Sequence, residues 1–131
     1  MISILRLTFP VILLILPLFR CTITYSSNYY VDKNASGQNN GTSWANAWQS
    51  FSDINWNSIR PGNIIYISGG TDSTVYYERL VIGASGSTDN YITIRNSYDT
   101  GHNGKVIIED PNTNSFDGCI YLSNRDYIYI K

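Results

Sequence analysis

The sequence predicts an all-β protein whose short strands stack as the coils of a solenoid. The chain is rich in Ile, Tyr, Asn, Ser, Thr and Gly, which is a strand-and-turn composition. Aliphatic residues alternate with aromatic or polar residues along several short runs. Aliphatic pairs in every second run recur after 22 to 28 residues, and repeats of about 20–50 residues indicate stacked repeating units.

Residues 1–26 are expected to be a secretory signal peptide. Arg6 supplies a positive start, and the apolar run over 9–19 is shorter than the roughly 20 apolar residues that span a bilayer. The alternatives are an uncleaved N-terminal anchor and lipoprotein processing at Cys21. Arg20 disfavours the second alternative, because a small residue is normally required before a lipidated cysteine.

Cleavage after residue 26 would leave 105 residues with 7 basic and 10 acidic side chains, a net charge of −3. This balance provides no basic patch to neutralise phosphates, so no nucleic-acid partner is expected. Cys119 would be the only remaining cysteine, which excludes an intramolecular disulfide. We expect a protein that is secreted or held at the cell surface, with no membrane contact after signal cleavage.

Residues 27–62 are expected to form an N-terminal strand, a loop and a capping helix. Ser43 is a suitable helix N-cap, and Pro61 would end the helix. An amphipathic helix here would cover the open end of a solenoid, whose strand edges and apolar core need protection. The apolar stripe at helical spacing comprises Trp44, Trp48, Phe51, Asn55 and Ile59.

Residues 63–131 carry the predicted strands of the first coils. One face of the strands is aliphatic and should point inward, whereas the other is mostly aromatic or polar. The predicted strands are 63–68, 77–82, 91–96, 105–110, 118–123 and 126–131. The predicted inward residues are Ile65, Ile67, Leu80, Ile82, Ile92, Ile94, Val106, Ile108, Ile120, Leu122, Ile128 and Ile130.

An antiparallel sandwich is the alternative to a solenoid. The connections lack the two-residue Asn-Gly or Asp-Gly turns of tight hairpins, which favours the solenoid. The chain stops at Lys131 inside a predicted strand, after about two to three coils. We therefore expect an N-terminal fragment of a longer protein, marginally stable or prone to aggregate when isolated.

These segments resemble the N-terminal part of secreted right-handed parallel β-helix proteins of the pectate-lyase-like superfamily. The resemblance covers residues 29–95 and depends on YYVDKNASGQNNGTSWANAW, RPGNIIYISGGT, YYERLVI and SGSTDNYITIRN. It implies a right-handed parallel β-helix with an N-terminal capping helix. It also implies a monomer when the protein is full-length.

The resemblance further implies a polysaccharide lyase that cleaves uronate-containing polysaccharides by β-elimination. In such a reaction a base removes the proton next to the carboxyl group, while calcium or a basic residue neutralises the carboxylate. No residue here matches a catalytic motif, so catalytic residues are expected downstream of this fragment, and calcium is a candidate cofactor only of the full-length protein. Glycoside hydrolysis, a non-enzymatic surface adhesin and a carbohydrate-binding module are the alternatives.

The loop that begins at Asp32 has part of a calcium-binding pattern. Asp32, Asn34 and Ser36 supply oxygens at the first, third and fifth positions, and Gly37 follows. The twelfth position is Ser43 instead of Glu, so a turn stabilised by its own side chains is preferred and no metal ligand is assigned.

Two further polar residues of the predicted strands are candidates for a site. Arg79 is predicted to share an outer face with Tyr66, Tyr91 and Tyr121, where it could stack on sugar rings or pair with uronate carboxylates. Ordinary outward strand residues are the preferred interpretation. Glu78 is adjacent to Arg79 in the sequence and would point to the opposite face of the strand.

The remaining candidates lie in loops or at a strand end. Asn34 and Asn40 begin formal glycosylation sequons. His102 lies in a Gly-His-Asn-Gly turn without the spacing of a metal site and is predicted to be a loop residue, and Cys119 is predicted to be unpaired.

Overall fold

The computed structural model describes residues 26–110 and 118–131. Regular structure in these ranges is almost entirely β-strand, which confirms the all-β class. The predicted signal peptide lies outside the described residues except for Ser26. No helix within the described ranges is long and apolar enough to cross a membrane.

The described residues form eight strands and one short 3-10 helix, η1 (Phe51–Asp53). Each predicted strand region contains a strand, and β3 is an additional one between the predicted strands over 63–68 and 77–82. The strands are β1 (Asn28–Val31), β2 (Ile64–Ile67), β3 (Ser73–Tyr76), β4 (Leu80–Val81), β5 (Ile92–Asn96), β6 (Lys105–Ile108), β7 (Ile120–Tyr121) and β8 (Ile128–Ile130).

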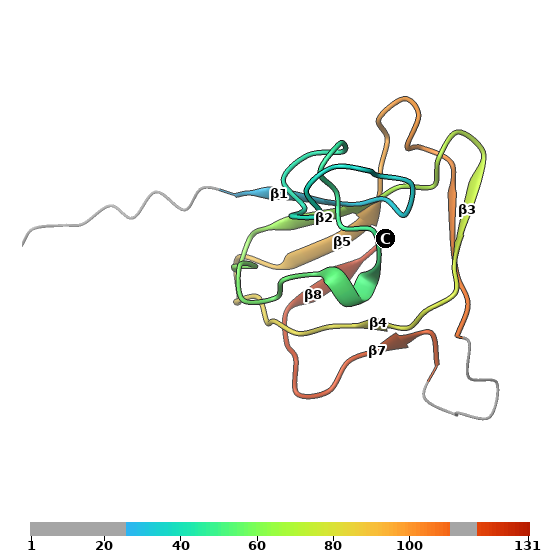
Figure 1. Cartoon of the computed structure of the whole chain (residues 1–131). Coiled ribbons are helices and arrows are strands. Elements are labelled where there is room, and N and C mark those ends of the chain that lie inside the picture. The colour runs from blue at the N-terminus through green and yellow to red at the C-terminus, as the bar shows by residue number, and fades with distance from the viewer. Residues whose placement is uncertain (1–25, 111–117) are drawn as a thin grey trace, which may run out of the picture.

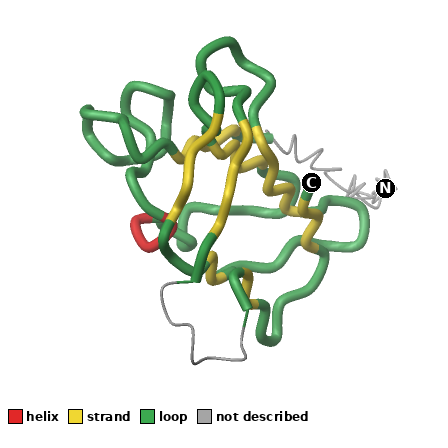
Figure 2. The backbone as a smooth tube through the Cα atoms, turned by 90° about the vertical axis from the view of Figure 1, so that its right-hand side faces the viewer, coloured by secondary structure: helices red, strands yellow, loops and turns green. Residues whose placement is uncertain are grey.

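The strands form three sheets, ordered β1-β2-β5-β8, β3-β6 and β4-β7 (Figure 1). All pairings between these strands are parallel, which excludes the antiparallel sandwich. From β2 onward the chain visits the three sheets in the same order twice and then returns to the first. Figure 2 shows β3 and β6 side by side on one face of the molecule.

The predicted spacing of 22 to 28 residues is wrong. From β2 onward each strand pairs with the third strand along the chain, so that Ile64 lies beside Thr93, 29 positions later. Leu80 lies beside Ile120, 40 positions later. The paired residues lie further apart than predicted because each passage of the chain contains three strands instead of two.

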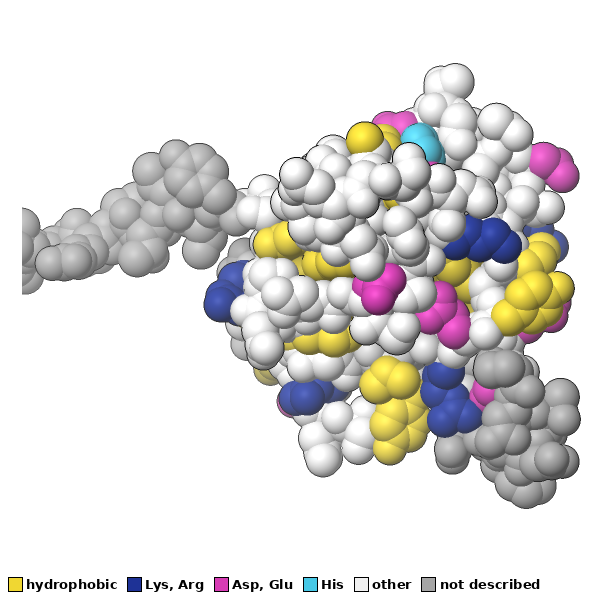
Figure 3. All heavy atoms as spheres, in the orientation of Figure 1, with side chains coloured by type: hydrophobic (Ala, Val, Ile, Leu, Met, Phe, Trp, Pro, Cys, Tyr) yellow, Lys and Arg dark blue, Asp and Glu magenta, His cyan; other side chains and the backbone are white. Residues whose placement is uncertain are grey.

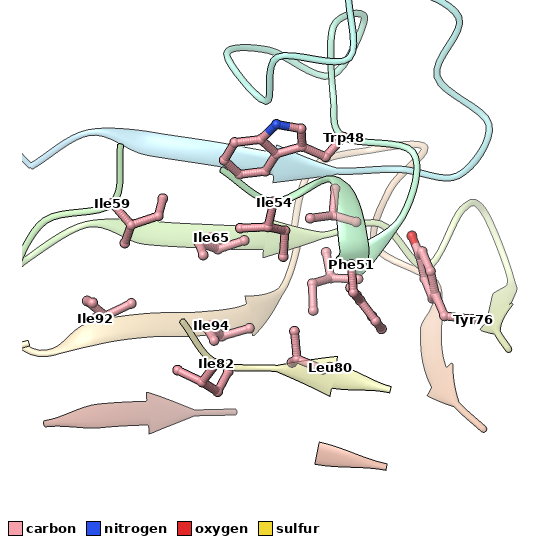
Figure 4. Close-up of a cluster of buried hydrophobic side chains, with 12 residues drawn as sticks. Trp48, Phe51, Ile54, Ile59, Ile65, Tyr76, Leu80, Ile82, Ile92 and Ile94 are labelled. Carbon is pink, nitrogen blue, oxygen red and sulfur yellow. The ribbon is translucent and has the colours of Figure 1, made fainter. Parts of the chain in front are cut away.

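The core lies between the three sheets and confirms the predicted inward face of the first strands (Figure 4). Ile65, Leu80 and Ile92 are at most 1% exposed. Leu122 and Ile130 are 45% and 40% exposed, so neither is buried. Ile130 nevertheless lines a pocket together with the inward residues Ile67 and Leu80, in agreement with its predicted direction. Ile130 belongs to β8 and Leu122 directly follows β7, and these are the last strands described in their sheets, so no described strand covers either residue.

The predicted amphipathic capping helix is wrong, because no α-helix forms over residues 44–59. Residues 44–59 fold as turns and η1, because polar side chains bond the local backbone in place of helical hydrogen bonds. Ser50 Oγ accepts from Asp53 N at 3.2 Å, and Asn55 Oδ1 accepts from Asn57 N at 3.2 Å. The apolar residues still enter the core, which includes Trp48, Phe51, Ile54 and Ile59 (Figure 4).

The corner after the four-stranded sheet repeats the same local bond. Asp32, Ser68 and Ser97 follow β1, β2 and β5 at equivalent positions in the register. A side-chain oxygen of each accepts a hydrogen bond from the backbone N–H two residues later, at 2.9, 3.1 and 2.9 Å. These turns bend the chain out of the sheet and hold Asp32 and Ser68 above one another.

Candidate functional site

The outer face of the sheet β1-β2-β5-β8 carries aromatic and cationic side chains in register. Tyr30 lies beside Tyr66, and Tyr66 lies beside Arg95. Lys131 continues the row, because its N–H donates to Ile94 O at 3.1 Å. We name the following residues the outer strip: Tyr30, Tyr66, Arg95, Tyr98, Tyr129 and Lys131.

Aromatic rings occupy the first half of the outer strip. The rings of Tyr30 and Tyr66 are stacked, with centroids 5.9 Å apart and an angle of 23° between their planes. Trp44 packs edge-on against Tyr30, with centroids 4.7 Å apart. In-register pairing on parallel strands places the two tyrosines one above the other, which explains the stack.

Cations occupy the second half, each over an exposed ring. The guanidinium carbon of Arg95 lies 4.2 Å from the centre of the Tyr98 ring, and Lys131 Nζ lies 4.9 Å from the centre of the Tyr129 ring. Tyr98 is 78% exposed. Within the described residues neither cation forms an ion pair. Both charges can therefore attract an anionic ligand, and the rings can contact its apolar faces.

The prediction for Arg79 is wrong, because its side chain lies outside the outer strip. Arg79 precedes β4 in another sheet, and its Nη2 lies 2.6 Å from Asp110 Oδ2 in a partly buried ion pair. Tyr91 precedes β5 and packs edge-on against Tyr127 at 5.8 Å. Tyr121 lies on β7, which belongs to a different sheet from β2 and Tyr66.

Sequence reasoning missed Arg95. The alternation of β5 contains the signal, since Ile92 and Ile94 point inward and therefore place Thr93 and Arg95 outside. The register with Tyr66 is visible only once the pairing of every third strand is known.

The predicted turn at Asp32 is present, and Asp32 is buried. Its Oδ1 accepts from Asn34 N at 2.9 Å, and its Oδ2 lies 3.1 Å from His102 Nδ1. The residues described here contain no cluster of three or more His, Cys, Asp or Glu side chains that could hold a metal ion. His102 lies in a turn, as predicted, and its contact with Asp32 connects the two loops.

The remaining candidates lie apart from the outer strip. Asn34 and Asn40 are both exposed, and Thr42 Oγ1 donates to Asn40 Oδ1 at 2.7 Å. Cys119 is partly exposed and forms no disulfide within the described residues. Glu78 accepts a hydrogen bond from Ser52 N at 3.3 Å, so it connects the strand region to η1.

Neither protein-family models nor curated proteins give a match to this chain. The face drawn in Figure 3 carries acidic and basic side chains scattered among hydrophobic ones, without a large area of one charge. The geometry of the outer strip is therefore the observation from which a function can be proposed.

Proposed function

We propose that this chain is the N-terminal part of a secreted carbohydrate-active protein with a right-handed parallel β-helix. The parallel register of every third strand supports this fold, because each sheet receives one strand from each passage of the chain. The repeated corners after Asp32, Ser68 and Ser97 support it as well, since equivalent turns recur where coils stack.

The proposed ligand is an acidic, uronate-containing polysaccharide. The observation that carries this proposal is the row Tyr30, Tyr66, Arg95 and Lys131 on one outer sheet face. A guanidinium group can donate two parallel hydrogen bonds to a carboxylate, and an ammonium group supplies a compact positive charge. Neighbouring tyrosine rings provide surfaces for the apolar faces of sugar rings. A polymer with regularly spaced carboxylates would meet both features along the strip.

The proposed reaction is β-elimination by the full-length protein as a polysaccharide lyase. A base removes the proton next to the carboxyl group, and positive charge stabilises the electron-rich intermediate. In this proposal the strip binds the polymer, whereas the base is supplied by residues further along the full-length protein. Calcium or a further basic residue would neutralise the carboxylate of the reacting unit.

The test is incubation of the full-length secreted protein with pectate, alginate and a glycosaminoglycan. We expect one of the three to yield unsaturated products, and its carboxyl-reduced form not to be cleaved. If no polymer yields an unsaturated product, the lyase proposal is wrong. N-terminal sequencing of the secreted protein tests cleavage after Ser26 in the same preparation.

A binding module or adhesin without catalytic activity is the second candidate. The observation that favours it is that the strip offers exposed rings and cations, which are contact groups and require no reaction. Saturable binding of a uronate polymer without product formation would support this candidate over the lyase.

A further inference from the structure

A shallow groove of about 400 Å³ lies next to the outer strip. Trp44 connects the two, because it packs against Tyr30 of the outer strip and also lines the groove. A cavity of this volume is in the range of small-molecule sites, about 300–1,000 Å³. The groove is lined by Asp32, Asn34, Ala35, Ser36, Gly37, Trp44, Ala45 and His102.

The contacts of His102 determine which ring nitrogen carries the proton. Nδ1 lies 3.1 Å from Asp32 Oδ2 and 3.0 Å from Ser68 Oγ. Ser68 Oγ in turn accepts from Gly70 N at 3.1 Å. An ionised carboxylate can only accept, so Nδ1 must donate, and in the neutral imidazole Nε2 then holds the lone pair.

The imidazole ring is held in place from a second side. The rings of His102 and Trp44 are stacked, with centroids 3.9 Å apart and 7° between their planes. Trp44 Nε1 donates to Asp99 Oδ2 at 2.8 Å, which fixes the indole. His102 also donates its backbone N–H to Asp99 O at 2.9 Å. The acceptor nitrogen is therefore preorganised, which lowers the entropic cost of binding a ligand.

The other side of the groove supplies further polar groups. Asn34 and Ser36 are exposed, and their side chains accept or donate no hydrogen bond within the part of the chain that the structure describes. Gly37 lies so close to Ala45 O and the Asn46 side chain that an added methyl group would overlap both, which keeps the loop against Trp44. The groove thus has a basic acceptor on one wall and amide and hydroxyl groups on the other.

We propose that this groove binds one hydroxyl-rich sugar unit, with a ligand hydroxyl donating to His102 Nε2. The inference extends the proposed carbohydrate function and rests on it. Its chemistry differs from that of the outer strip, because the groove recognises hydroxyl groups and the strip recognises carboxylates. The groove should therefore bind a neutral sugar as well as a charged one.

The chain contains one histidine, so nitrogen NMR of the ¹⁵N-labelled imidazole reports on this site alone. We expect the neutral ring of the free protein to carry its proton on Nδ1 and none on Nε2. The probe is methyl-esterified tri-galacturonate, which has sugar hydroxyls but no carboxylates. It should shift the Nε2 signal saturably, and Asn34→Ala should weaken that binding about threefold to tenfold, as expected for one lost hydrogen bond.

Unesterified tri-galacturonate separates this inference from the proposed function. If it shifts the Arg95 side-chain signal but neither trisaccharide moves the His102 signals, the groove inference is wrong and the proposed ligand class stands. If neither residue responds to either trisaccharide, the groove inference fails and pectate is excluded as the ligand of the outer strip. A protonated Nε2 in the free neutral ring would also overturn the inference, because the nitrogen could not accept a hydroxyl proton.

Discussion

Gly69 and Gly104 lie backbone against backbone, without room for a methyl group on either residue. A Cβ on Gly69 would overlap the carbonyl group of Gly104, and a Cβ on Gly104 would overlap the carbonyl oxygen of Gly69. Gly104 N also donates to Gly70 O at 2.8 Å. The turn after β2 and the turn before β6 therefore stack in direct contact, which sets the spacing between successive passages of the chain.

We predict that Gly69→Ala lowers the free energy of unfolding by at least about 2 kcal/mol, because backbone atoms on both sides must move to admit the methyl group. Denaturant unfolding of the secreted protein measures the change. Thr71→Ala is the matched control, since Thr71 is exposed in the same turn, and its unfolding midpoint should stay close to wild type. An unchanged midpoint for Gly69→Ala would show that the turns separate easily.

The two tryptophans of the turn segment should differ in their effect on stability. Trp48 is 2% exposed and stacks on Tyr29 with centroids 5.3 Å apart, whereas Trp44 is partly exposed. We predict that Trp48→Ala costs about 3–5 kcal/mol of unfolding free energy, because the core loses a large side chain. Trp44→Ala should cost clearly less. Thermal unfolding of the two variants makes the comparison, and equal losses would contradict the assignment of Trp48 to the core.

The sequence was sufficient to predict the all-β class and the inward aliphatic face. The inward direction of Ile65, Ile67, Ile92 and Ile94 follows from the two-residue period of a strand. It does not depend on the order in which the strands pair. The helix over residues 44–59 failed because apolar spacing alone does not register competition from Ser50 and other short polar side chains.

The candidate site was harder to predict than the fold class. Arg95 joins Tyr66 only through pairing between strands that are far apart in the sequence, and the missed strand β3 hid that pairing. His102 meets Asp32 across 70 positions, where local sequence patterns carry no signal. Long-range contacts of this kind depend on register, which short motifs do not specify.

The hydroxyl group of Tyr76 should make the protein sensitive to alkali. Burial raises the pKa of Tyr76, and the negative charges of Asp32 and Glu78 raise it further. The folded state therefore retains this proton at a pH where the unfolded chain, with a tyrosine pKa of about 10, has lost it. Stability is then fully present below about pH 10 and decreases as pH rises above it.

Tyr76→Phe provides the measurement for this pH dependence. The variant should lose about 1 kcal/mol at neutral pH, because Tyr76 OH donates to Ser68 O at 2.9 Å. Its stability should then fall less steeply than wild type in denaturant unfolding between about pH 9 and 11. Tyr91→Phe is the control, since Tyr91 is 49% exposed and should leave the slope unchanged. Parallel pH curves for wild type and Tyr76→Phe would exclude Tyr76 as the cause.

The cations of the outer strip should determine affinity for uronate oligosaccharides. Arg95 and Lys131 lie on one sheet face and form no ion pair within the described residues, so each is available to a carboxylate. We predict that Arg95→Ala weakens binding of tri-galacturonate about tenfold in low salt, equivalent to about 1.4 kcal/mol. The loss should shrink as salt is added, because exposed charges are screened. Lys33→Ala removes an exposed lysine outside the outer strip, whose Nζ donates to Val75 O of another sheet, and should bind like wild type. Calorimetric titration measures the affinity of the two variants for tri-galacturonate, and their unfolding temperatures check that both are folded. Equal affinities would show that the outer strip does not recognise the carboxylates.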